Sequence, residues 1–418
     1  MSQLGYMEKL LDGVEVEWKP LGEVCDFKNG FAFKSSLFKE TGLPIIRITN
    51  IDGKNVDLSD VKYFNPTDYT KGNPLNYSIS KGDILIAMSG ATTGKIGYYN
   101  SSKTAYLNQR VGKFEPQQEI INNRYLYHFL LTKTSFIYVL AGGGAQPNLS
   151  SNNLKEKLLV PIPYPNSPKE SLETQAEIVR ILDTFAELTA ELTAELTARQ
   201  QQYAYYRDQL LTFEEGDVEW KELSELTLST SNIKWSDTDS VYRYIDLSSV
   251  SRENNKITET TEITAENAPS RAKKLVEKDD VIFATTRPTQ QRICLIDDEY
   301  SGGVVSTGYC VLRANPSAVI PKWIYFYLSS SNFKTYLEDV QSGSAYPAVS
   351  DAKVKSFKIP IPPLSEQKRI VSILDKFDTL TTSLTEGLPR EIELRQQQYE
   401  YYRDLLLNFP KPEVLEHD

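Results

Sequence analysis

The segment RQQQYAYYRDQLLTF at residues 199–213 recurs with few changes as RQQQYEYYRDLLLNF at residues 395–409. A second pair of matching segments lies before the first: QAEIVRILDTF at residues 175–185 matches QKRIVSILDKF at residues 367–377. Repeats with a spacing of roughly 200 residues indicate a duplicated structural unit. The other pairs occur in the same order and are less alike: VEWKPLGE (16–23) with VEWKELSE (218–225), KGDILIA (81–87) with KDDVIFA (278–284), AQPNLS (145–150) with AYPAVS (345–350), and LLVPIPYP (158–165) with FKIPIPPL (357–364).

The N-terminus carries a third, partial copy, since YMEKLLDGVEVEW from Tyr6 resembles YRDQLLTFEEGDVEW from Tyr206. The repeat is then circular in order, because the sequence begins with a helix end that resembles the ends of the two long repeated helices. This order predicts that the two chain ends lie near each other and that the repeat is pseudo-twofold. A short capping helix with an accidental likeness is the alternative, because the match is brief.

One long helix is predicted between the two domains. From Leu172 to Phe213 the sequence has no glycine or proline, and apolar residues recur every three or four positions. This spacing is typical of an amphipathic helix, here of about 42 residues and about 60 Å. Its middle, AELTAELTAELTA (186–198), is a four-residue repeat. We interpret it as a spacer whose repeat number sets a distance; a leucine stripe against a partner helix is the plainer interpretation.

A second long helix is predicted over residues 365–409, in a matching rhythm that allows the two helices to pair. It contains Gly387 and Pro389, and its segment between the shared motifs is four residues longer, because Arg395 follows Asp375 by 20 positions whereas Arg199 follows Asp183 by 16. Proline removes a helical donor and clashes with the preceding turn. We therefore expect a kink or a restart near Pro389.

The regions between the helices have short runs rich in Ile, Val and Tyr, separated by Gly, Asn, Asp and Ser clusters, with some helical stretches. The fold class predicted is α+β, with two mixed α/β domains separated by two long antiparallel, coiled-coil-like helices. The predicted boundaries are an N-terminal helical segment at 1–15, a first domain at 16–165, a central spacer helix at 166–217, a second domain at 218–363, and a distal helix with the C-terminal tail at 364–418.

Charge and composition narrow the functional class. The net charge is −10, but residues 16–165 carry 17 basic against 12 acidic side chains, whereas residues 166–217 carry 4 against 11. A basic first domain suits a polyanion, and the acidic linker suits a protein partner. Two histidines and three scattered cysteines offer little material for a metal site, and no stretch predicts a membrane span or a signal peptide. We expect a cytoplasmic protein.

Several motifs together carry a family resemblance. They are FKNGFAFKS at 27–35, PIIRITNI at 44–51, SGATTGKIGYY at 89–99, LNQRV at 107–111 and AQPNLS at 145–150, followed by PIP before a helix. With them the chain resembles, over essentially its full length, the specificity subunit of a Type I restriction-modification system. The four-residue repeat is similar to that of the subgroup whose spacer carries TAEL units.

The resemblance implies a subunit without catalytic activity. Its two target-recognition domains would each read one half of a bipartite site in double-stranded DNA, and the helices would set the gap. Two modification subunits would dock on the helical regions, and restriction subunits would join them. This chain would hold no cofactor, because S-adenosylmethionine, ATP and Mg²⁺ would be bound by those partners.

Polar loop residues are the candidates for DNA contact, because bases are read by Arg, Lys, Asn, Gln, Ser and Thr at the groove edges. The loop at 285–292 stands where the glycine-rich SGATTGK loop stands in the first domain, and departs from it in sequence. The predicted DNA-binding residues are Lys34, Arg47, Ser89, Thr92, Thr93, Lys95, Asn108, Gln109, Arg110, Gln146 and Asn148 in the first domain, and Thr285, Thr286, Arg287, Gln290, Gln291, Arg292 and Tyr346 in the second.

The repeated helices supply the candidates for partner binding. Two alternatives stay open: a coiled-coil scaffold that never touches DNA, and a methyltransferase that would itself bind S-adenosylmethionine. A phosphate-loop reading of GATTGKI (90–96) fails, because its spacing is short and isoleucine follows the lysine. The predicted partner-binding residues are Ile178, Leu182, Tyr203, Tyr206, Ile370, Leu374, Tyr399 and Tyr402.

Overall fold

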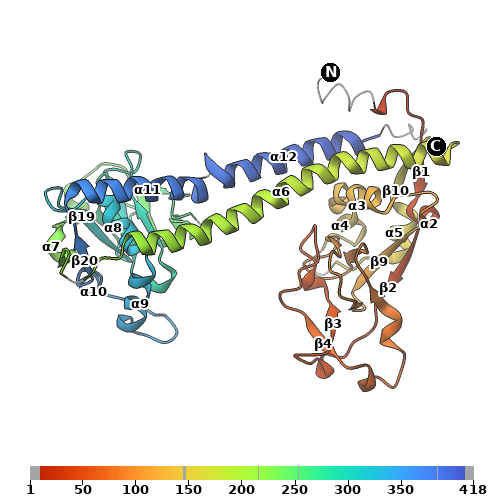
Figure 1. Cartoon of the computed structure of the whole chain (residues 1–418), viewed down its shortest axis with the longest axis horizontal. Helices are drawn as coiled ribbons and strands as arrows, with labels where there is room; N and C mark the ends of the chain where they lie inside the picture. The colour runs from red at the N-terminus through yellow and green to blue at the C-terminus, as the bar shows by residue number, and fades with distance from the viewer. Residues whose placement is uncertain (1–9, 145–146, 215, 253, 384, 410–418) are drawn as a thin grey trace. The chain divides into compact units, whose positions relative to one another are not determined.

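A computed structural model describes residues 10–144, 147–214, 216–252, 254–383 and 385–409. Contacts divide the chain into unit 1, residues 1–189 with 395–418, and unit 2, residues 190–394. Each unit combines one mixed α/β domain with parts of both long helical segments (Figure 1). The α+β class is confirmed.

Unit 1 contains one two-stranded sheet and two four-stranded sheets. In the order β2-β9-β6-β7 all neighbours are antiparallel, whereas in β4-β3-β8-β5 the pair β3 and β8 is parallel. Strands β1 and β10 pair with each other and so join the two ends of the domain. The bounds are β1 Val16–Pro20, β2 Cys25–Asn29, β3 Leu43–Ile46, β4 Lys62–Phe64, β5 Ser78–Ile79, β6 Ile84–Ala87, β7 Ile96–Tyr98, β8 Ala105–Leu107, β9 Val111–Pro116 and β10 Leu159–Pro163.

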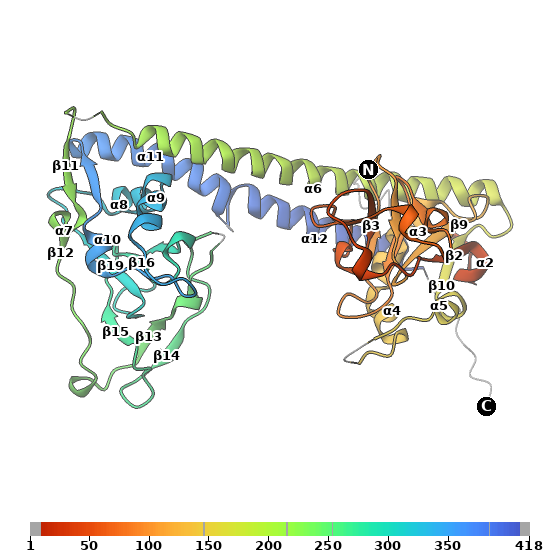
Figure 2. The same cartoon turned by 90° about the horizontal axis from the view of Figure 1, so that it is seen from below.

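Unit 2 repeats these sheets strand for strand, in the orders β12-β19-β16-β17, β14-β13-β18-β15 and β11-β20. Figure 2 labels several of these strands, among them β13, β14 and β15. The parallel pair also recurs, as β13 with β18. The two domains thus share one topology although their sequences have diverged. The bounds are β11 Glu219–Glu222, β12 Thr227–Leu228, β13 Tyr242–Ile245, β14 Thr261–Ile263, β15 Ala272–Leu275, β16 Val281–Ala284, β17 Ile293–Leu295, β18 Val304–Ser306, β19 Tyr309–Ala314 and β20 Lys358–Ile361.

Short helices lie between strands in both units, and side-chain caps begin several of them. Ser150 caps α5 and Ser350 caps α10, in each case by accepting a backbone N–H from three residues ahead. Such a cap satisfies one of the donors that a helix start leaves unpaired. The bounds are α2 Leu21–Val24, α3 Asn123–Thr132, α4 Thr134–Leu140 and α5 Ser151–Lys157 in unit 1, and α7 Leu223–Leu226, α8 Pro321–Leu328, α9 Ser331–Val340 and α10 Asp351–Lys355 in unit 2.

The first long helix is continuous. Helix α6 spans Pro168–Leu210, 43 residues, which confirms the predicted helix and places its start four residues earlier. The second is interrupted: α11 spans Leu364–Thr382 and α12 spans Gly387–Leu407. Residues 383–386 therefore separate them, which confirms the predicted restart.

The break takes up the four surplus residues of the second segment, so the helical length between the shared motifs equals that of α6. Gly387 has a φ of +80°, and a Cβ there would lie 2.6 Å from the Thr379 carbonyl oxygen. Glycine thus permits both the turn and the close approach. Pro389 lies in the first turn of α12, where a proline is tolerated.

The core of each unit joins the helix start of one copy to the helix end of the other. In unit 1, Ile178 and Leu182 of α6 pack in one cluster with Leu406 and Leu407 of α12. In unit 2, Leu374 of α11 packs with the end of α6. Of the third, partial copy at residues 6–18 the structure describes residues 10–18, in which Leu10 and Leu11 pack against the unit 1 core. The predicted meeting of the chain ends lies outside the described residues.

Candidate nucleic-acid interface

The predicted loop of the first domain connects β6 to β7 and is fastened to the segment after α4. The Gly90 amide donates to the Pro147 carbonyl oxygen at 3.2 Å, and the Leu149 amide donates to that of Met88 at 2.8 Å. Gly90 and Gly94 have φ values of +80° and +86°. Glycine adopts this left-handed region without penalty, so the sequence SGATTGK suits the turn.

The second domain builds the same loop without glycine. The Arg287 amide donates to the Pro347 carbonyl oxygen at 2.7 Å, and the Val349 amide donates to that of Thr285 at 2.9 Å. Arg287 and Gln291 therefore take the places of Gly90 and Gly94, with φ values of 51° and 44°. Non-glycine residues in this region are uncommon and cost of order 1 kcal/mol each.

Two of the predicted DNA-contacting residues, Thr93 and Thr285, are buried in this structure. Thr93 is 5% exposed, and its hydroxyl donates to the Gly90 carbonyl oxygen at 2.7 Å. The Thr285 side chain is 8% exposed, and its hydroxyl donates to the Gly308 carbonyl oxygen at 2.9 Å. Both threonines hold the loops in shape and present no free polar group to DNA.

Other predicted side chains are half-buried and already engaged. The Arg47 guanidinium donates to the Asp60 backbone carbonyl at 3.2 Å and lies 3.5 Å from the Asp60 carboxylate. Arg292 donates to the Leu247 carbonyl oxygen. Gln291 donates to two carbonyl oxygens at the end of α8, each at 3.0 Å. Arg47, Gln291 and Arg292 are therefore first of all supports for their loops.

The remaining predicted residues divide by exposure. Gln146 lies outside the described residues. Ser89, Thr92 and Asn108 are half-buried, and the Ser89 hydroxyl has no hydrogen-bond partner among the described residues. The side chains exposed on the loops or beside them are those of Lys34, Lys95, Gln109, Arg110, Asn148, Thr286, Arg287, Gln290 and Tyr346.

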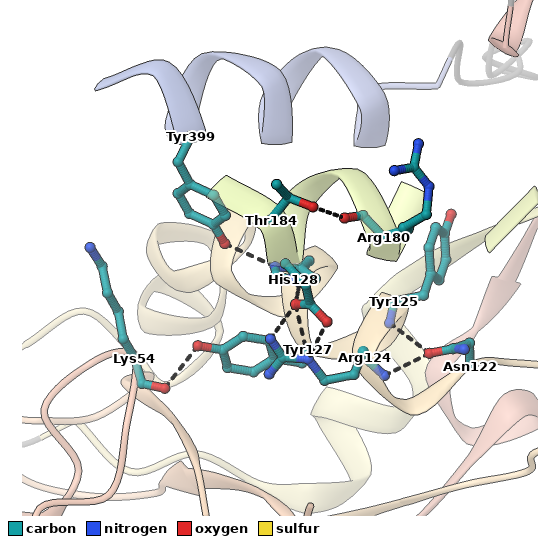
Figure 3. Close-up of polar contacts among 10 residues, drawn as sticks. Lys54, Asn122, Arg124, Tyr125, Tyr127, His128, Arg180, Thr184 and Tyr399 are labelled. Atoms are coloured by element: carbon teal, nitrogen blue, oxygen red, sulfur yellow. Dashed lines mark hydrogen bonds and ion pairs between the residues drawn. The ribbon is translucent and has the colours of Figure 1, made fainter. Parts of the chain in front are cut away.

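A buried polar network holds the first domain onto the long helices (Figure 3). His128 of α3 is hydrogen-bonded through Nε2 to the Asp183 carboxylate of α6 at 2.8 Å and through Nδ1 to the Tyr399 hydroxyl of α12 at 2.9 Å. Arg124 donates to Asp183 as well. These bonds lower the pKa of Asp183 to about 2 although its partial burial opposes this, and burial lowers the pKa of His128.

One buried glutamine repeats in both units. The Gln175 side-chain oxygen accepts from the Asn122 amide at 2.8 Å, and its amide donates to the Ile120 carbonyl oxygen at 3.0 Å. Gln367 bonds the Ile320 amide and the Ala318 carbonyl oxygen in the same way, both at 3.1 Å. Each glutamine therefore fixes the start of one domain helix to one long helix.

Most of the predicted partner-binding side chains are enclosed within the chain. Tyr206 and Tyr402 retain exposed surface, but these six are 9% exposed or less: Ile178, Leu182, Tyr203, Ile370, Leu374 and Tyr399.

Tyr205 and Tyr401, which the sequence did not single out, are 61% and 58% exposed and occupy equivalent places in the two copies. The sequence did contain a signal for these two residues, because an aromatic residue lies outside the apolar stripe of the helix at the same place in both copies.

Comparisons with known proteins agree on one family. The sequence pattern of the "Type I restriction modification DNA specificity domain" matches residues 13–199 and 215–394. The chain is 37% identical to the EcoR124I/EcoR124II Type I restriction enzyme specificity subunit of Escherichia coli, over 99% of this chain and 100% of that protein. It is 33% identical to a putative Type I specificity subunit of Haemophilus influenzae, over 97% and 98%.

Solved structures share the fold. The S subunit of the Type I restriction-modification system of M. genitalium is 16% identical, with a TM-score of 0.55 over 96% of this chain and 98% of that one. A chain from a structure of Type I complex assembly is 15% identical, with a TM-score of 0.59 over 94% and 97%. No helix in the described part of the chain has the length and apolar character to cross a membrane. The chain belongs to the family of Type I restriction-modification specificity subunits.

Proposed function

We propose that this chain is the DNA-reading subunit of a Type I restriction-modification complex, in which each domain reads one half of a bipartite site. One observation carries the proposal: the two units keep the same topology and the same helix contacts while their loops differ. Gln175 and Gln367 make equivalent bonds, whereas Gly90 is replaced by Arg287. Two identical partner subunits that act on an asymmetric DNA sequence need a subunit of this kind. Its two helical docking surfaces would be alike, and its two DNA-binding domains would differ in their loops.

The chemistry is assigned to the partner subunits. Modification subunits would bring S-adenosylmethionine, and restriction subunits would bring ATP and Mg²⁺. This chain would recognise the DNA sequence and position the partner subunits on it, in the cytoplasm where the DNA is found. A DNA-free scaffold would not need two loop-rich domains of one topology, which is why we favour the DNA-reading role.

Two modification subunits would dock on the repeated helical segments. Tyr205 and Tyr401 are exposed at equivalent places, and each lies edge-on against the next tyrosine, at 5.4 Å and 5.3 Å between ring centroids. Exposed tyrosines are typical anchors of protein interfaces. Two copies of one aromatic surface fit two copies of one partner.

The long helices would set the gap between the half-sites. Helix α6 has no break along its 43 residues, and the surplus of the second segment lies in its four-residue interruption. The helical lengths between shared motifs are therefore matched. A change in the number of TAEL units should then change the spacing between readers.

The test is to co-express the chain with its modification subunits, expose the complex to random DNA, and map methylated adenines by sequencing. The proposal predicts a split motif with a fixed gap. A well-assembled complex that methylates without sequence preference would contradict it and favour the scaffold. Binding of S-adenosylmethionine by the isolated chain would favour the methyltransferase alternative.

A further inference from the structure

Arg287 has a left-handed backbone conformation that a glycine would adopt without strain, so the turn itself does not explain why an arginine is there. Its φ of 51° is at the position where the first domain has Gly90, with a φ of +80°. The backbone bond that fixes this turn, from the amide to the Pro347 carbonyl oxygen, is made by Gly90 in the first domain with Pro147. A glycine would therefore serve the turn equally well and without strain.

Gln291, the other residue in the left-handed region of this loop, has a structural reason to be there. Its amide group donates to the Leu328 and Ser330 carbonyl oxygens, each at 3.0 Å, and so clamps the loop to the end of α8. The Arg287 side chain has no such use. It is exposed, and it forms no ion pair with a carboxylate among the described residues. The backbone bond explains the turn but not the choice of arginine over glycine, and strain kept for a side chain at such a position points to a function of that side chain.

The Arg287 guanidinium instead lies over an aromatic ring. Its central carbon is 5.8 Å from the centroid of Tyr346, which is 73% exposed. Arginine stacks on aromatic faces, and such a contact limits the orientations of its planar fork. The neighbouring Arg292 is turned inward to the Leu247 carbonyl oxygen and cannot compete for the same ligand.

We propose that Arg287, oriented by Tyr346, is a specificity-determining side chain of the second domain and donates a pair of hydrogen bonds to a guanine edge in the major groove. This inference rests on the proposed DNA-reading function. The fork of an arginine matches the O6 and N7 acceptors of guanine, the commonest specific contact between side chains and bases. A phosphate contact would need a positive charge but no fixed plane, and a lysine would supply that charge equally well.

The two domains would then read DNA differently at equivalent loops. Gly90 has no side chain, so the first domain can present only backbone groups there, together with neighbours such as Lys95. The second domain presents a guanidinium. A guanine preference that depends on this loop is therefore expected in the second half-site only.

The experiment compares assembled complexes that carry Arg287→Gly, Tyr346→Ala or the control Lys278→Ala. Lys278 is exposed, pairs with Asp298 at 2.6 Å, and precedes β16, whereas the loop follows it. The control thus removes one positive charge from the other end of the same strand. Binding is measured on duplexes that carry each base pair at each position of the second half-site, and methylated motifs are mapped in parallel.

For Arg287→Gly we expect discrimination at one guanine of the second half-site to fall roughly 5- to 150-fold, the first half-site to persist, and thermal stability to equal or exceed that of the wild type. Tyr346→Ala should weaken the same position less, and Lys278→Ala should leave discrimination unchanged. Loss of affinity that is equal on all duplexes, complete loss included, would overturn the inference and assign Arg287 to phosphate. A wild-type complex without any split motif would instead contradict the proposed function.

Discussion

Deletion of one TAEL unit, residues 189–192, should shorten the gap of the recognised site by one or two base pairs. Four helical residues correspond to about 6 Å of rise and about 40° of rotation. Against DNA with about 3.4 Å and about 35° per base pair, the rise corresponds to about two base pairs and the rotation to about one. Helix α6 is continuous through this tract, so the deletion keeps its helical phase to within that rotation.

The assay maps methylated adenines with the deleted subunit in an assembled complex. Both half-sites should persist, because the deletion removes no residue of either domain. A length-preserving control, Thr189→Ala with Thr193→Ala, should keep the wild-type gap. Leu188 and Leu192 mark the same helix face one unit apart, so the apolar register survives the deletion. Full methylation with an unchanged gap would refute the reasoning that helix length sets the spacing.

Three further predictions concern the contacts that hold and use the units. Asp183→Asn should lower the free energy of unfolding of unit 1 by about 1 to 2 kcal/mol at neutral pH, because the folded pKa of about 2 lies below the usual 3.8. This contribution is present above pH 4 and is lost as the pH falls through about 2, so the difference between variant and wild type in acid titrations should vanish only below that pH. Gln175→Leu or Gln367→Leu leaves a buried backbone amide unpaired, and chemical denaturation should show a loss of about 1 to 3 kcal/mol confined to the unit concerned, whereas equal losses in both units would contradict the assignment. Tyr205→Ala or Tyr401→Ala should each reduce the binding of one modification subunit, and native mass spectrometry of the double variant should show neither bound; full occupancy would refute that surface.

Much of this fold could be predicted because it depends on repeated, local patterns. The apolar spacing and the absence of glycine and proline predicted α6, and Gly387 with Pro389 predicted the interruption that the structure shows after Thr382. Loop positions could also be predicted, since SGATTGK and its counterpart follow equivalent buried strands. Periodicity identifies a helix face, but it does not say what that face contacts.

Long-range pairing explains what was missed. Tyr203 and Tyr399 were expected at a partner surface, yet the helix end of each copy packs into the unit of the other copy and buries them. Thr93 and Thr285 have the composition of DNA-contacting residues but turn inward to backbone carbonyls. The strain at Arg287 has no sequence signal of its own, because it appears only when the loop is compared with its glycine-containing counterpart in three dimensions.

The most direct test of the central claim is to replace residues 218–363 with a second copy of residues 16–165 and map the methylated motif. The segment that is removed begins and ends with the paired strands β11 and β20, and the inserted segment begins and ends with the paired strands β1 and β10. The pairing that joins the two ends of the domain is therefore kept. If each domain reads one half-site, the motif becomes an inverted repeat of the first half-site with a fixed gap. A motif that keeps the original second half-site would contradict the account.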